Sequence, residues 1–300
     1  MKKIVVSAVV LAASIAPAFS ADLVKKPAAA AVAAPAAPPP WDIAFGGAIM
    51  TDYNFRGVSQ SNRGPSAGAY FEPQFNTPMG QFYLGLAGWS IDWPSGTNYG
   101  FTDPAAEIDY YGGWRYTWGQ LSVDIGTIYY YYPKEQFNGF TKDSDFFEIY
   151  GKLSYAVTKD LTIGGNIFYT PDLLNYSETW NGSDVGAVYA SLTGKWVTPW
   201  TWGDLGAYIS GELGHWWIDD KNWITSATLP NTDPSYTYWN VGLALTYKAL
   251  TLDLRYHGTD QSVRDCNSFL VVSPGNKSSN WCNDTFIASL KFDTTLSALK

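Results

Sequence analysis

Charged side chains are scarce in this sequence. Asp, Glu, Lys and Arg make up 15% of the 300 residues, whereas a water-soluble globular protein carries roughly a quarter. Aromatic residues are abundant instead: they reach 17%, and the 14 tryptophans and 21 tyrosines account for most of them. Contact with lipid explains a surface that is poor in charge and rich in rings more directly than exposure to water does.

Long apolar runs are also missing after the first twenty residues, which excludes transmembrane helices, because a helical span needs about 20 apolar residues. The first twenty, MKKIVVSAVVLAASIAPAFS, have two lysines, a short apolar core and small residues before Ala21. This arrangement predicts a secretory signal over residues 1–20, too short in its apolar part for a permanent anchor. Loss of its two lysines would change the formal charge from −8 to −10, and this acidic balance does not favour nucleic-acid binding.

Residues 21–40, ADLVKKPAAAAVAAPAAPPP, form an Ala/Pro tract. Its prolines disfavour a helix and favour an extended chain. We expect a disordered periplasmic spacer here, with a periplasmic contact as the less favoured alternative.

Cysteine and histidine are rare, with two of each. In an oxidising compartment, Cys266 and Cys282 are expected to form one disulfide. An unstrained bond closing this loop would stabilise the fold by about 3 kcal/mol. So few ligating side chains argue against a zinc site, and we predict neither a metal nor another cofactor.

Apolar and polar residues alternate with period two, the period of a β-strand. In residues 42–57 one set runs from Ile43 to Phe55 and the opposing set includes Asp52, Asn54 and Arg56. The predicted strands are 42–57, 66–76, 81–93, 107–116, 121–129, 147–155, 161–169, 183–196, 204–217, 239–247, 250–257 and 286–292. We therefore expect about twelve strands, and we expect Tyr53 and Phe55 to face lipid until the first strand ends at Gly57.

Short connections alternate with longer polar ones along the chain. This pattern predicts an all-β fold: a transmembrane, antiparallel, up-and-down β-barrel over residues 41–293, with a tail at 294–300. Short turns would be periplasmic and longer loops extracellular. A soluble sandwich or propeller is the alternative. It fits less well because the apolar faces are often tipped by Tyr or Trp and the opposite faces are polar.

Charged and polar residues on the second face are candidates for lining the lumen. They are Asp52, Asn54, Arg56, Glu107, Asp109, Arg115, Asp124, Glu148, Lys152, Asp253 and Arg255. Charges of both signs would filter polar solutes, and the excess of carboxylates predicts a mild preference for cations. About twelve strands imply a narrow pore. Alternatively, these charges pair across strands and plug the barrel. The loop at 258–283 is expected on the surface, with an inward constriction as the alternative.

Several blocks resemble the TorF-type porin family of proteobacterial outer-membrane proteins. They are DYNFRGVSQS (52–61), FYLGLAGWSIDW (82–93), EIDYYGGWRY (107–116), LSVDIGTIYYYYP (121–133) and FFEIYGKLSYAV (146–157), in this order. The resemblance implies an outer-membrane barrel that acts as a pore, without a defined substrate. The chain departs from the usual pattern because DTTLSALK follows Phe292, which would otherwise be the terminal aromatic of the assembly signal.

The sequence thus predicts a narrow passive channel for small polar solutes or ions in a Gram-negative outer membrane. A non-conducting structural or adhesive barrel, binding through loops such as 218–238, is the alternative. An enzyme is disfavoured because His215, His257 and Ser262 have no orienting Asn or Asp at a specific spacing, so we predict no catalytic residue. Expected partners are outer-membrane lipid and lipopolysaccharide, the barrel-assembly machinery, periplasmic chaperones and the solutes themselves, with a homo-oligomer allowed.

Overall fold

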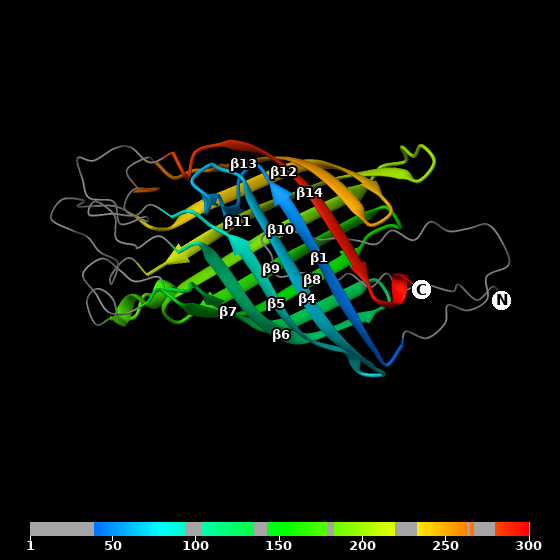
Figure 1. The fold of residues 1–300 in the computed structure, drawn as a ribbon, viewed down its shortest axis with the longest axis horizontal. Coiled ribbons are helices and arrows are strands. Elements are labelled where there is room, and N and C mark those ends of the chain that lie inside the picture. The colour runs from blue at the N-terminus through cyan, green and yellow to red at the C-terminus, as the bar shows by residue number, and fades with distance from the viewer. Residues whose placement is uncertain are drawn as a thin grey trace.

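A computed structural model describes residues 39–93, 104–134, 143–178, 183–219, 233–262, 265–266 and 280–299 (Figure 1). The expected signal peptide and nearly all of the Ala/Pro tract lie outside these ranges. The strands are β1 (Trp41–Met50), β2 (Asn54–Phe55), β3 (Val58–Ser59), β4 (Ser66–Thr77), β5 (Gly80–Ser90), β6 (Ala106–Trp118), β7 (Leu121–Tyr131), β8 (Phe146–Ala156), β9 (Leu161–Thr170), β10 (Ala187–Val197), β11 (Leu205–Ile218), β12 (Tyr236–Tyr247), β13 (Leu250–Thr259) and β14 (Thr285–Thr295).

Twelve of these strands, all except β2 and β3, close into one antiparallel barrel in the described part of the chain. Each strand pairs with its neighbours in sequence, and β1 closes the sheet by pairing with β14, as in Ala48 opposite Lys291. The prediction of an up-and-down barrel of about twelve strands is confirmed. The start of β1 and the end of β14 lie at the end of the barrel where the short turn between β4 and β5 is (Figure 1).

The two faces of the barrel wall differ in polarity. Apolar side chains on the outside are open to the surroundings, for example Leu192 with 70% of its surface exposed and Leu213 with 54%. Side chains of the opposite set, such as Glu148 and Arg115, are buried inside. This distribution suits a sheet that turns one face to hydrocarbon, where closure removes every unpaired strand edge. Among the described residues, no helix has the length and apolar character to cross a membrane.

The first strand is shorter than predicted. It ends at Met50 rather than Gly57, and the chain then turns into the barrel. Tyr53 is therefore only 1% exposed and lies inside, so the prediction that Tyr53 and Phe55 face lipid is wrong. The physical reason is that residues 51–63 make hydrogen bonds among themselves, including Gln60 N to Tyr53 O at 2.6 Å, that replace those of a barrel strand.

The last strand is longer than predicted. β14 continues to Thr295, two residues beyond the expected end of the barrel, and a 3-10 turn, η3 (Ser297–Leu299), follows it. The backbone N–H of Ser297 donates a hydrogen bond to Asp42 on β1 at 3.0 Å. The end of the chain is thereby attached to the strand that closes the barrel.

Candidate functional site

Residues 51–63, named here the inserted segment, cross the lumen of the barrel. The segment starts from β1, yet its side chains reach β6 and β8 on the far wall, for example Glu107 and Glu148. In the order of the closed sheet, β8 lies five strands from β1, almost diametrically opposite. A chain that contacts both walls has to span the space between them.

A two-residue turn forms the tip of the inserted segment. Phe55 pairs with Val58 in the small β2–β3 hairpin, and Arg56 and Gly57 between them have positive φ angles of 47° and 92°. Such a turn requires left-handed backbone at both positions. The Asn54 side chain supports it by accepting a hydrogen bond from the Gly57 N–H at 2.9 Å.

The side chain of Arg56 ends in a cage on the barrel wall. Its two terminal nitrogens donate to the two carboxylate oxygens of Glu148, each at 2.8 Å. Its guanidinium carbon lies 4.7 Å from the ring centroid of Phe168, 4.4 Å from that of Tyr189 and 4.6 Å from that of Trp216. These four wall residues are named here the Arg56 cage. The cage combines a bidentate charged hydrogen bond with cation–π contacts, both of which favour a guanidinium.

Glu148 and Phe55 tie the cage to further aromatic side chains. The Tyr130 hydroxyl donates to the second oxygen of Glu148 at 3.0 Å. The Phe55 ring lies 4.6 Å from the guanidinium carbon and packs edge-on to the rings of Tyr130 and Trp216, both at 5.9 Å. The guanidinium is thus enclosed by rings from both the segment and the wall.

Asp52 and Tyr53 hold the base of the inserted segment. Asp52 accepts hydrogen bonds from the hydroxyls of Ser59 at 2.6 Å and Ser61 at 3.1 Å, and lies 3.5 Å from the guanidinium of Arg63. Burial raises the pKa of Asp52, an effect that these hydroxyls and Arg63 partly offset. The Tyr53 hydroxyl donates to Glu107 on β6.

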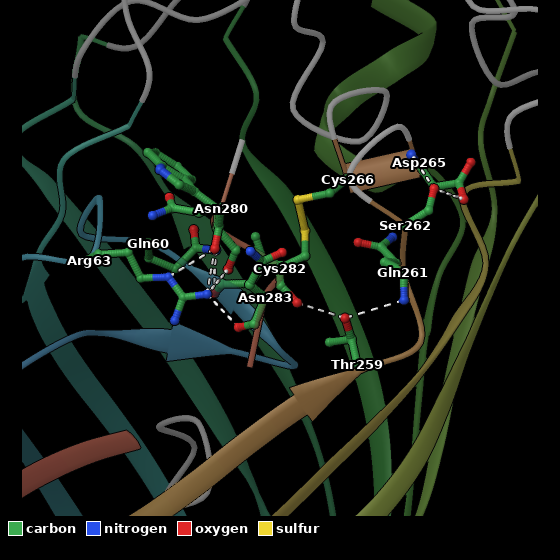
Figure 2. The surroundings of a disulfide bond; sticks show 12 residues. Gln60, Arg63, Thr259, Gln261, Ser262, Asp265, Cys266, Asn280, Cys282 and Asn283 are labelled. Atoms are coloured by element: carbon green, nitrogen blue, oxygen red, sulfur yellow. Dashed lines mark hydrogen bonds between the residues drawn. A yellow bond between two sulfur atoms is a disulfide. The ribbon is translucent and has the colours of Figure 1, made fainter. Parts of the chain in front are cut away.

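The residues just before β14 hold the inserted segment from the other side (Figure 2). Arg63 donates from Nε to the carbonyl of Asn280 at 3.1 Å and from Nη2 to the carbonyl of Trp281 at 3.2 Å and to that of Asn283. The Ser59 N–H also donates to the Trp281 carbonyl at 3.0 Å. Residues 280–283 are named here the carbonyl clamp.

A disulfide ties the carbonyl clamp to another loop. It joins Cys266 to Cys282, with their Cα atoms 5.9 Å apart. The Cys282 carbonyl accepts a hydrogen bond from the Thr259 hydroxyl at the end of β13, at 2.8 Å. The clamp is therefore attached covalently to the loop after β13 and non-covalently to the inserted segment.

Several other charged candidates have partners inside the barrel. Arg115 donates to Glu72 at 2.9 Å and lies 3.8 Å from the ring centroid of Tyr83, whose hydroxyl donates to Asp124. Lys152 lies 4.6 Å from the ring centroid of Tyr150. Arg115 on β6 and Tyr83 on β5 thus reach partners two strands away, on β4 and β7, inside the barrel.

Three charged residues lie together on the inward face of β13 and β14. Asp253 accepts from Arg255 at 3.1 Å and from Lys291 at 3.0 Å. A small cavity of about 30 Å³ lies between this triad and the inserted segment, lined among others by Asp52 and Asn54. Such a volume holds on the order of two water molecules. Within the described ranges, no group of three or more His, Cys, Asp or Glu residues is arranged to hold a metal ion.

The candidates from sequence have different kinds of partner. Arg56 pairs with Glu148, another candidate, whereas Arg115 pairs with Glu72, which was not among the candidates. Asp109, buried on β6, is not in an ion pair among the described contacts. Sequence reasoning missed Glu72, Arg63, Lys291 and the interior rings. Period two places Glu72 and Lys291 on inward sets and could have found them, whereas Arg63 lies in a stretch without alternation.

The two histidines lie on opposite faces of the wall. His215 packs on Trp217 with ring centroids 4.6 Å apart and contacts the hydroxyl of Thr237 at 3.0 Å. His257 is buried inside, where its Nδ1 lies 2.9 Å from the Tyr238 hydroxyl. They therefore do not share a site.

Three solved structures are similar to this chain at low sequence identity. The NanC porin is 12% identical, with 83% of this chain and 97% of that chain covered and a TM-score of 0.45. The COG4313 outer membrane channel from Pseudomonas putida F1 is 11% identical, with coverages of 87% and 97% and a TM-score of 0.49. LpxR from Salmonella typhimurium is 10% identical, with coverages of 83% and 99% and a TM-score of 0.41. Likenesses this distant do not bear on activity.

No curated protein matches the sequence. The resemblance to the TorF-type family is not confirmed and stays a prediction. A family described as "Bacterial protein of unknown function (Gcw_chp)" matches residues 33–274, which is most of the chain. The chain, a closed barrel crossed by an inserted segment, therefore belongs to the Gcw_chp family.

Proposed function

We propose that the protein is a narrow passive channel of the Gram-negative outer membrane for small polar solutes or ions, and that the inserted segment closes it in the state described. The observation that carries this proposal is the set of buried ion pairs inside the lumen, above all Arg56 with Glu148, which joins the inserted segment to the far wall. Burying such a pair costs desolvation that apolar residues of similar size would avoid. A barrel that served only as a scaffold would be filled more stably by apolar side chains.

The charge of the interior supports a preference for cations. Among the buried residues in the described ranges, carboxylates outnumber lysines and arginines. The carboxylates are Asp42, Asp52, Glu72, Glu107, Asp109, Asp124, Glu148 and Asp253, and the basic residues are Arg56, Arg115, Arg255 and Lys291. A lumen with excess negative charge lowers the energy of a cation in the passage relative to an anion.

Planar-bilayer recordings of the refolded wild type and of the Arg56→Ala variant test the proposal. We expect low conductance from the wild type, larger conductance from the variant, and a reversal potential under a KCl gradient that shows cation preference. Clear anion selectivity would overturn the preference.

A filled lumen also fits a barrel that never opens, which is the structural or adhesive alternative. Absence of conductance from both proteins, with an intact β circular dichroism spectrum, would favour that alternative. Interaction with lipopolysaccharide, the assembly machinery or a second copy of the chain remains a proposal, to be tested by crosslinking in cells.

A further inference from the structure

We propose that the Arg56 cage is a recognition site for small guanidinium solutes, and that Arg56 occupies it as a tethered ligand. The inference rests on the proposed channel function, because it names the class of solute that would open the passage. A solute of this class competes with Arg56 for Glu148 and the surrounding rings. When it binds, the tip of the inserted segment loses its hold on the far wall.

The wall supplies a complete site without help from the segment. Glu148 lies on β8, Phe168 on β9, Tyr189 on β10 and Trp216 on β11, so four successive strands each contribute one side chain. All four belong to the inward sets of their strands. The three rings also pack on one another along the wall, Phe168 with Tyr189 at 6.3 Å and Tyr189 with Trp216 at 6.4 Å between centroids.

The cage fits the shape of a guanidinium better than that of a plain ammonium. A planar fork places two N–H groups on the two oxygens of one carboxylate, which the equal 2.8 Å distances show for Arg56 and Glu148. The faces of the ion remain free to lie against aromatic rings, here with three wall centroids between 4.4 and 4.7 Å. An ammonium is a point charge and cannot form the paired hydrogen bonds.

The side-chain contacts of Arg56 explain an arginine in this turn, whereas the backbone conformation of the turn does not. Left-handed backbone favours Gly, Asn or Asp, and an arginine at φ 47° is strained there. Gly57, the other turn residue, has no room for a side chain, because an added Cβ would lie 2.1 Å from Cγ2 of Thr259. An arginine at the one turn position with space, with its guanidinium in the cage, is arranged as a ligand on a tether.

Removing Arg56 leaves a cage that lacks its cation. Glu148 is buried and is bonded on one oxygen by the Tyr130 hydroxyl, so it keeps its orientation in the absence of the arginine. A carboxylate left unpaired in such surroundings favours uptake of another cation. The Arg56→Ala variant should therefore bind external guanidinium compounds more tightly than the wild type, in which the tethered group competes.

Isothermal titration calorimetry of the full chain, refolded in detergent, with methylguanidinium chloride tests this expectation. We expect the Arg56→Ala variant to bind at least about tenfold more tightly than the wild type, and the Arg56→Ala/Glu148→Gln variant to lose at least about tenfold of that affinity. Methylurea, which has a similar shape and no charge, should not bind measurably. Equal binding of methylguanidinium by the single and double variants, or equal binding of methylurea, would overturn the proposal.

Arg115 provides a matched control. It also pairs with a buried carboxylate, Glu72, but among the described residues only one ring, that of Tyr83, lies over it. The Arg115→Ala variant should gain less affinity for methylguanidinium than Arg56→Ala does. An equal gain would show that any vacated arginine position suffices, which contradicts a dedicated cage.

Bilayer recordings of the wild type keep the proposal testable if Arg56→Ala does not fold. Adding methylguanidinium chloride should raise the fraction of time in an open state, whereas KCl at the same ionic strength should not; an equal response to both contradicts the proposal. The two proposals fail separately. Selective binding without any conductance would refute the channel function but support the recognition site. Conductance without selective binding would support the channel function but refute the recognition site.

Discussion

At the scale of single residues, Arg56 joins the inserted segment to the opposite wall. Arg56 and Glu148 are both buried, so each charge depends mainly on the other for compensation. Removal of one partner of a buried pair destabilises by about 3–5 kcal/mol, whereas replacement of both by apolar side chains is often neutral.

We therefore expect Arg56→Leu to lower the temperature at which the protein loses its compact migration on a gel. The Arg56→Leu/Glu148→Leu variant should recover most of this loss, because it leaves no unpaired charge. Similar transition temperatures for the two variants would show that the lumen is wet enough to solvate Glu148 alone.

Tyr53 shows why the side of the barrel wall that a single residue faces was hard to predict. Alternation continues through Asp52, Tyr53, Asn54 and Phe55 as though the strand went on, and local pattern carries no information on distant partners. The partners that draw Tyr53 and Phe55 inside are Glu107 on β6 and Trp216 on β11. Asp52, Asn54 and Arg56 do lie in the interior, but they reach it because the chain leaves the wall and not through strand alternation.

At the scale of elements, the inserted segment is held by two separate attachments. One is the Arg56 cage, and the other is the carbonyl clamp around Arg63, whose position the Cys266–Cys282 disulfide restricts (Figure 2). The clamp accepts hydrogen bonds through backbone carbonyls, so no side-chain pattern in residues 280–283 could have indicated it.

Replacing both cysteines by serine should loosen the clamp and increase conductance while the gel migration of the folded barrel remains. Arg63→Ala should have a similar effect by removing the donor. Because both changes act on one attachment, their combination should have less than the sum of the separate effects. If the two increases in conductance simply add in bilayer recordings, the disulfide does not act through the carbonyl clamp.

At the scale of the whole molecule, the twelve strands were predictable because period two is a local signal repeated in every strand. The lipid-facing set follows from the same signal, and Leu192 is the clearest member of it with 70% exposure. Packing inside the lumen was not predictable, since it depends on which of the inward side chains meet across the closed sheet.

An arginine at Leu192 should destabilise the barrel in lipid vesicles by up to about 2–4 kcal/mol, the cost of placing this charge in hydrocarbon near the middle of a bilayer. Thr201→Arg, on the exposed turn between β10 and β11, is the matched control and should change stability by less than about 0.5 kcal/mol. Urea-unfolding midpoints measure both. Equal midpoints for the two variants would mean that the outer face at Leu192 is in water.

The seam between β1 and β14 brings the two ends of the barrel chain together, with Ser297 bonded to Asp42. Circular permutation should therefore be tolerated: a short peptide would link residue 299 to residue 40, and new termini would open at the turn of residues 158–160. Such a permutant should fold to the same closed sheet, because the rearrangement alters covalent order and preserves every strand pairing.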